Sequence, residues 1–340
     1  MKFGVFDHVD RGAGPLAGLY EGRLRLAELY DRSGFHAYHI AEHHSTPLGM
    51  ASSPGVLLAA VAQRTRRLRL GPLVYTLPLM HPLRVLEEIC MLDQLSNGRL
   101  EVGVGRGSSP YELGYFGVDA QTSSKLYVES YQIILQGLQS REINFEGEMF
   151  RLRNVPVVLE CIQKPHPPLW YGVSNIDAVP WAARNGLNIV CQGPAARTRA
   201  ITDLYRTEWH EAAGGGAAAL PLMGLGRHLM VGETAKEARE VARRAFAVWY
   251  GSLRHLWRLH GHSFTHYPIP EDFDAAERAG ILIAGTPDEV TAGLKREIES
   301  SGVNYVLTRF AYGDLSLEES VHSLDLFTRE VMPEFAPGVA

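Results

Sequence analysis

The chain has no hydrophobic run that approaches the roughly 20 residues needed to cross a membrane. A secretion signal is also missing, because Asp7 and His8 interrupt the first apolar stretch. The longest basic run, residues 64–69, has no interleaved aromatic residue, and the net charge is only -5. We therefore expect a cytoplasmic protein with neither a membrane nor a nucleic acid as its partner.

Cysteine is scarce. The three cysteines, Cys90, Cys161 and Cys191, have no CxxC spacing, which excludes a zinc ribbon and a disulfide framework. Their odd number and isolated positions are typical of a reducing compartment. The chain also has no HExxH motif, and adjacent histidines such as His43 and His44 chelate poorly. We expect no metal site.

Core-forming residues are plentiful, with 46% hydrophobic and 21% charged residues. Apolar strands alternate with helical patterns along the whole chain. The strands are predicted at residues 2–7, 35–41, 68–74, 100–104, 169–173, 187–191, within 223–230, and at 303–310. Eight alternations in 340 residues predict the α/β class, specifically one (β/α)8 TIM-barrel domain over residues 1–340 rather than a doubly wound sheet.

Two inserts interrupt this alternation. Residues 141–167, after the fourth strand and its helix, are rich in proline and fit neither a helix nor a buried strand. Residues 260–280 have no clear periodicity, and they follow a helix predicted from the capping box of Thr234 and Glu237 to about residue 259. A second capping box, Thr286 with Glu289, begins the next helix, and a closing helix is predicted at 317–332.

Polar groups follow four of the predicted strands, where barrel enzymes keep their chemistry. These exits are residues 7–8, 42–44, 105–109 and 174–175. In an extended segment His43 and His44 point to opposite sides, so only one faces the barrel mouth. That imidazole would be a base or a hydrogen-bond donor, or the two histidines only pin a loop.

Arg106 lies between two glycines, in a stretch that superficially resembles a dinucleotide-binding fingerprint. Pro110 and Gly114 predict that residues 105–122 stay in a loop, which argues against that fingerprint. Arg106 would instead bind a phosphate or carboxylate, or pair with a carboxylate of the protein itself. Four histidines of the second insert, at 255, 260, 262 and 266, indicate a solvated flap rather than a metal site.

Several motifs occur in order along nearly the whole chain and most densely from 35 to 119. They are Phe3-Gly4-Val5-Phe6, Ala41-Glu42-His43-His44, Leu77-Pro78 with His81-Pro82, residues 92–99, Gly105-Arg106-Gly107, residues 115–119, 181–186 and 284–290, and Val331-Met332-Pro333. Together they resemble the bacterial luciferase-like, flavin-dependent monooxygenase family, and look closest to the luciferase α subunit.

This resemblance implies a TIM-barrel enzyme that binds reduced FMN (FMNH2) at the barrel mouth. An NAD(P)H:flavin reductase would supply the FMNH2, and the enzyme would be a homodimer. Dioxygen would add to the flavin C4a, and the resulting peroxide would oxidise a small organic substrate such as an aldehyde or ketone. Residues 260–280 match the mobile lid of the family, which fits the exclusion of water.

The resemblance also implies roles for single residues. His43 matches the catalytic histidine, with His44 beside it. The cofactor-binding positions are Leu73 and Val74, at a non-proline cis peptide against the flavin ring, and Arg106, Gly107, Ser108, Ser174 and Asn175 around the phosphate. This chain departs from the luciferase α subunit at Gly105, where a cysteine is expected, and at Ser124, where an arginine is expected; the nearest cation there is Lys125.

Two alternatives remain open. The same barrel would serve hydride transfer with the deazaflavin F420, which would show as reduction without oxygen uptake. A non-catalytic flavin-binding or partner subunit would bind flavin without turnover, although Glu42, His43 and His44 are all present.

Overall fold

Parallel strands form a closed ring in the computed structural model, which describes residues 1–173, 175–212, 219–264 and 269–336. The ring strands are β1 (Lys2–Asp7), β2 (Ala37–Ile40), the interrupted strand β3 (Arg69–Pro72) with β4 (Tyr75–Thr76), β5 (Val102–Gly105), β8 (Leu169–Gly172), β9 (Asn188–Cys191), β10 (Met223–Val231) and β12 (Tyr305–Arg309). They pair in the order β3-β2-β1-β12-β10-β9-β8-β5-β4.

The ring closes because β3 and β4 are two halves of one extended segment. The backbone N–H of Leu70 donates to the carbonyl of Arg99 at 3.1 Å, and the N–H of Glu101 donates to the carbonyl of Leu70 at 2.8 Å. β4 then pairs with β5. The predicted (β/α)8 TIM barrel is therefore confirmed.

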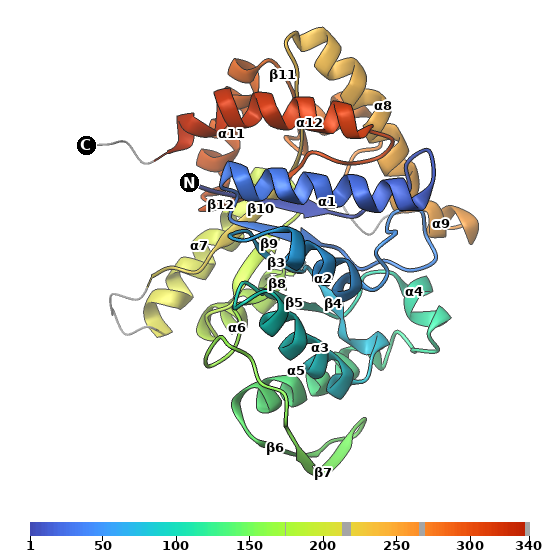
Figure 1. The fold of residues 1–340 in the computed structure, drawn as a ribbon, viewed down its shortest axis with the longest axis vertical. Helices are drawn as coiled ribbons and strands as arrows, with labels where there is room; N and C mark the ends of the chain where they lie inside the picture. The colour runs from blue at the N-terminus through green and yellow to red at the C-terminus, as the bar shows by residue number, and fades with distance from the viewer. Residues whose placement is uncertain (174, 213–218, 265–268, 337–340) are drawn as a thin grey trace.

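Helices surround the ring, as Figure 1 shows. They are α1 (Leu16–Ser33), α2 (Pro54–Arg64), α3 (Pro82–Leu95), α4 (Pro110–Tyr115), α5 (Ser123–Gln139), α6 (Val179–Arg184), α7 (Ala195–Ala212), α8 (Ala235–Leu253), α9 (His255–Leu259), α10 (Phe273–Arg278), α11 (Pro287–Ser301) and α12 (Leu317–Leu326). Short turns η1 (Leu77–Leu79), η2 (Ile176–Ala178), η3 (Phe327–Val331) and η4 (Met332–Phe335) complete the list. Among these helices none is long and apolar enough to cross a membrane.

Alternation along the strands divides the core into two layers. On β1 and β12, Val5 and Val306 point outward to the helices, whereas Phe6 and Leu307 point into the barrel. Local signals end and begin the helices as expected: Gly34 closes α1 at φ +81°, and the Thr286–Glu289 capping box opens α11.

The first insert differs from the sequence expectation, because it contains an antiparallel hairpin of β6 (Glu142–Glu146) and β7 (Arg151–Pro156). The hairpin projects from the lower end of the molecule in Figure 1, and most of its side chains are exposed or half-buried. A strand without a buried face lacks the apolar alternation that marks a strand in sequence.

The second half of the chain holds an additional strand, β11 (Leu282–Gly285), which was not predicted. β10 extends past the ring to reach it: Met223–Leu225 pair with β9, Gly224–His228 with β12, and His228–Val231 with β11. The helix predicted from 234 to 259 ends at Leu253 and restarts as α9. The closing helix gives way to η3 after Leu326.

Two of the cysteines are not isolated in space. The sulfur atoms of Cys90 on α3 and Cys161 lie 3.7 Å apart, and all three cysteines are buried and unbridged. The isolated positions inferred from sequence spacing are therefore wrong for this pair, because the segment after β7 returns to cover α3.

Candidate active site

The polar side chains inside the barrel form two groups, one toward each end of the strands. The group toward the amino ends, which we call the lower interior, consists of Arg69, His36, His39, Glu101 and Trp170. We call the upper interior the group at the carboxyl ends of the strands: His8, His43, Gln192, His228 and Arg309. Barrel enzymes place their chemistry at the upper end.

Glu101 connects the lower interior. Its carboxylate lies 2.6 Å from Arg69 Nε, 3.3 Å from His36 Nε2 and 3.8 Å from His39 Nε2, and it accepts a hydrogen bond of 2.7 Å from Trp170 Nε1. Burial raises the pKa of Glu101, but the hydrogen bond from His36 and the charges of His39 and Arg69 outweigh it and lower the pKa to about 2. This carboxylate therefore stays ionised and paired.

His43 lies at the mouth of the barrel beside a carboxylate. Its Nδ1 is 3.1 Å from Oε1 of Glu112, and its ring centroid is 5.6 Å from that of His8. A neutral His43 that donates Nδ1–H to Glu112 keeps Nε2 free to accept a proton. The His43 side chain is 19% exposed, so a molecule in the mouth can reach it.

His44 points the other way, as the extended geometry predicted. Its Nε2 lies 3.0 Å from Oε1 of Glu42, and its ring packs against Phe116 with centroids 4.6 Å apart. Its backbone N–H donates to Glu112 at 3.3 Å. Glu42 in turn accepts from the backbone N–H of Thr76 at 3.2 Å. His44 is thus held in the wall of the site, whereas His43 faces its mouth.

Glu112 lies in a segment for which the sequence interpretation was wrong. Residues 110–115 form the short helix α4 instead of a loop. The reason is local: Pro110 suits the first helical position, and the Ser109 hydroxyl accepts a hydrogen bond from the backbone N–H of Glu112 at 3.3 Å. Glu112 is 6% exposed, so it is buried against the two histidines.

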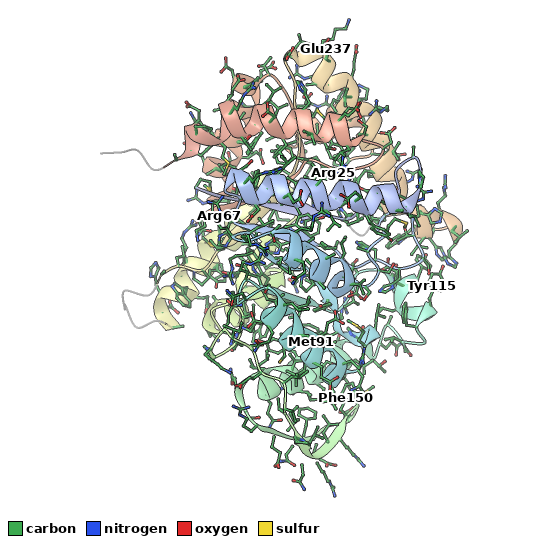
Figure 2. All side chains as sticks on the ribbon, viewed as in Figure 1. Arg25, Arg67, Met91, Tyr115, Phe150 and Glu237 are labelled. Carbon is green, nitrogen blue, oxygen red and sulfur yellow. The ribbon has the colours of Figure 1, made fainter. Side chains whose placement is uncertain are left out.

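The insert after α9 contacts α4. Tyr111 stacks on His260 with ring centroids 4.3 Å apart, and its hydroxyl is hydrogen-bonded to Nδ1 of His262. The hydroxyl of Tyr115 lies 2.7 Å from Nε2 of His260. Figure 2 shows Tyr115 on the side of the molecule where α9 lies. Of the four insert histidines, two therefore contact α4, and His266 lies outside the described residues.

In the part of the chain that the structure describes, no three His, Cys, Asp or Glu side chains group together as a metal ion would require.

Arg106 follows β5 and is exposed, and its Nη1 donates to the hydroxyl of Ser124 at 3.2 Å. Among the described residues no carboxylate pairs with it. Lys125 is less available than Arg106 to bind a phosphate, because its ammonium already pairs with Glu148 at 2.6 Å. The alternative in which Arg106 pairs with a carboxylate of the protein is therefore not seen.

Of the other predicted phosphate positions, Gly107, Ser108 and Asn175 lie on the same rim. Gly107 has φ +86°, and Ser108 follows it toward α4. Asn175, after β8, caps η2: its side chain accepts from the backbone N–H of Asp177 at 3.2 Å. Ser174 lies outside the described residues.

The Leu73–Val74 peptide between β3 and β4 is cis, as the resemblance implied. β5 approaches it closely, because a Cβ at Gly105 would lie 2.5 Å from Cγ2 of Val74. Val74 and Gly105 are only half-buried, so they present an apolar edge to the mouth. A cation without a carboxylate partner for a phosphate and an apolar edge for a ring system fit the chemistry of FMN.

Apart from His43 and the polar strand exit at His8, sequence analysis did not single out the groups of the upper interior. His8 accepts a hydrogen bond from Trp249 Nε1 at 3.4 Å, and Arg309 donates to Oε1 of Gln192 at 2.7 Å. Burial, and then the charges of Arg309, His43 and His228, hold the pKa of His8 well below its usual value. His8 is therefore neutral near pH 7.

Residues 1–305 match the luciferase-like monooxygenase family, so the chain belongs to that family and the predicted membership is confirmed. It is 43% identical over 336 residues to an uncharacterized protein, y4wF, of Sinorhizobium fredii, which covers 98% of this chain and 96% of that protein. It is 30% identical over 193 residues to the oxygenase component of the flavin-dependent trigonelline monooxygenase of Acinetobacter baylyi, covering 56% of this chain and 53% of that one.

Solved structures share the fold over the full length. The monooxygenase RslO1 of Streptomyces bottropensis has a TM-score of 0.88 and 27% identity, covering 99% of this chain and all of that one. An F420-dependent secondary alcohol dehydrogenase, with a TM-score of 0.75 and 18% identity over 99% of each chain, has the same fold. The chain is thus an enzyme of a monooxygenase family whose fold also serves F420.

Proposed function

We propose that the protein is an FMNH2-dependent monooxygenase that oxidises a small organic substrate with dioxygen. The observation that carries the proposal is the Glu112–His43 pair, which lies on the same rim of the barrel as Arg106. One rim thus offers a base with a defined acceptor atom and a cation without a carboxylate partner. The flavin-dependent relatives support FMN over F420.

The residues divide the task between them. Arg106 would bind the phosphate, with Gly107, Ser108, Ser174 and Asn175 beside it, and Leu73 and Val74 would contact the flavin ring. Bound FMNH2 would supply the two electrons needed to activate dioxygen. Nε2 of His43 would take or return the proton of the reacting oxygen or substrate, while Glu112 keeps the imidazole in the required tautomer.

The proposal includes two partners. The trigonelline relative is named as an oxygenase component, which supports a separate NAD(P)H:flavin reductase as the source of FMNH2. By analogy with the family, the chain would act as a homodimer. These partners would be tested by reconstitution with a flavin reductase and by sedimentation of the purified protein.

The first test is rapid mixing of the protein and photoreduced FMN with oxygenated buffer, without substrate. A long-lived absorbance spectrum that differs from those of both FMN and FMNH2 is expected. Immediate reoxidation at the rate of free FMNH2, with no affinity for FMN in either redox state, would contradict the proposal. Reduction of a substrate by reduced F420 without oxygen uptake would then identify the alternative chemistry.

The role of His43 is tested separately with His43→Ala. We expect kcat for substrate oxidation to fall by about 10²–10⁴-fold, the usual contribution of a general base, while FMNH2 affinity stays within about twofold. His322→Ala, which removes an exposed histidine on α12, is the matched control and should have no effect. Unchanged turnover in His43→Ala would remove His43 from the mechanism.

A further inference from the structure

Arg309 is a buried cation in the upper interior. It is the last residue of β12, on the same face as Tyr305 and Leu307, and its guanidinium carbon lies 4.7 Å from the centre of the Phe6 ring. Only 5% of its surface is exposed, and its Nε is buried without a hydrogen-bond partner.

Arg309 differs from the other buried arginines of the barrel in having no counter-ion. Arg23 lies 2.9 Å from Asp7, and Arg227 lies 2.5 Å from Glu297. Among the described residues no carboxylate lies within 4 Å of Arg309, whose one hydrogen bond goes to the neutral amide of Gln192. A buried charge without a partner is costly in a folded protein and points to a partner from outside.

The groups around Arg309 do not supply that partner. His8 and His228 are buried, and burial followed by the charge of Arg309 lowers the pKa of each well below its usual value. Both ring nitrogens of His228 lack hydrogen-bond partners. The carboxyl groups whose charges act on Arg309 are those of Asp10 and Asp7. Asp7 is already paired with Arg23, and burial raises the pKa of the Asp10 carboxyl well above its usual value, so Asp10 is a weak counter-ion.

The charge of Arg309 itself persists. Burial lowers its pKa, with the charge of Arg227 adding to the effect, but only to about 9. At neutral pH Arg309 is therefore a positive charge, and its buried neighbours His8 and His228, whose pKa values are lowered, do not neutralise it. Gln192 is half-buried, and its Oε1 accepts from Arg309. The glycine at 226 leaves room for this amide, because a Cβ there would lie 2.4 Å from Oε1 and would push the amide aside.

We infer that Arg309 and Gln192 form a subsite for a carboxylate, and that the substrate is accordingly a small organic acid. The planar fork of a guanidinium matches the two oxygens of a carboxylate, and the orphan Nε offers a donor that the protein does not use. Arg106, which is exposed and follows the strand β5, remains for the phosphate of the flavin. The identity of the bound group as substrate rests on the proposed function, whereas the binding of a carboxylate does not.

The test measures binding of benzoate and of its neutral analogue benzamide to the flavin-free protein by isothermal titration calorimetry. The wild type should bind benzoate at least tenfold more tightly than benzamide. Arg309→Met should abolish this preference, and Arg309→Lys should restore part of it. Arg25→Met, which removes an exposed cation on the helix α1, outside the ring of strands, is the matched control and should keep the full preference.

Three results would overturn the inference. The first is equal affinity of the wild type for both compounds, and the second is a benzoate preference that survives in Arg309→Met. The third is a selective loss of FMNH2 affinity in Arg309→Met with benzoate binding intact, which would assign Arg309 to the flavin. Failure of the proposed function is distinguishable, because the wild type would then prefer benzoate but would not bind FMN.

Discussion

The barrel interior is charged at both ends, but the two ends satisfy their charges in opposite ways. In the lower interior Glu101 has Arg69, His36 and Trp170 within hydrogen-bond distance. In the upper interior Arg309 has a single neutral partner, and both nitrogens of His228 have none. Glu101 is thus fully paired within the chain, whereas Arg309 has no ionic partner among the described residues. In the lower interior, over the part of the chain that the structure describes, the one buried side-chain atom without a hydrogen-bond partner is Nδ1 of His39.

This difference separates residues that maintain the fold from residues that await a ligand. Barrel proteins place stability at one end of the strands and chemistry at the other. Buried polar groups that have no partner within the protein reduce its stability, and such groups are kept where function requires them. The comparison therefore predicts opposite responses to substitution at the two ends.

The largest effect is expected from Glu101→Leu, which leaves Arg69 and His36 without their carboxylate. The free energy of unfolding should fall by about 3–5 kcal/mol, as for other broken buried ion pairs. Glu148→Leu, which removes the exposed partner of Lys125, should cost less than about 1 kcal/mol. Urea denaturation of both variants measures the difference, and equal losses would refute the special role of the lower interior.

Part of the pH dependence of stability should also come from the lower interior. Burial lowers the pKa of His39 to about 4, against 6.5 in the unfolded chain, so the unfolded state takes up a proton first as the pH falls. The free energy of unfolding should therefore decrease by roughly 3 kcal/mol between pH 6.5 and pH 4. His39→Gln should make the total decrease smaller by this share, while the buried His8 and His228, whose pKa values are also lowered, keep the rest. A pH profile identical to that of the wild type would contradict the assignment.

On the rim, Arg106→Ala should weaken FMN affinity by about 1.5–3 kcal/mol, which is the scale of a lost hydrogen bond to a charged group. Lys125→Ala should leave the affinity unchanged, since its ammonium is bound to Glu148. Fluorescence titration of FMN with both variants is the measurement. Equal weakening in the two variants would show that the phosphate lies elsewhere.

The smallest effect on stability is expected from Arg309→Met. Because the cation has no counter-ion, its replacement should not reduce the free energy of unfolding and should increase it by about 1 kcal/mol. Arg227→Met, at an equally buried arginine, should instead cost about 3 kcal/mol because it strands Glu297. Urea denaturation compares them, and a large loss in Arg309→Met would mean that the upper interior is satisfied after all.

Sequence patterns were sufficient for the ring because its strands are buried on both faces and read as short apolar runs. They were insufficient for α4 and β11. A helix of six residues is too short to show periodicity, although the Ser109-Pro110 cap signal was present. In sequence, the four apolar residues of β11 cannot be distinguished from one turn of a buried helix.

The candidate site was predictable only in part, because its contacts join distant segments. His43 and Arg106 were found from their positions after strands, but Glu112 is 69 residues away from His43 and reaches it only in the folded barrel. Arg309 is visible in the sequence as a charged residue within the largely apolar segment 303–310. The absence of a counter-ion, however, is a property of three-dimensional packing and cannot be read from a sequence.

The extension of β10 past the ring has an evolutionary consequence. The register of the ring is set where β10 pairs with β9 and β12, and β11 is added only along His228–Val231. Segments between α8 and β11 can therefore lengthen, shorten or be exchanged without shifting any ring strand. Such an arrangement lets descendants of one barrel acquire new substrates while inheriting an unchanged scaffold.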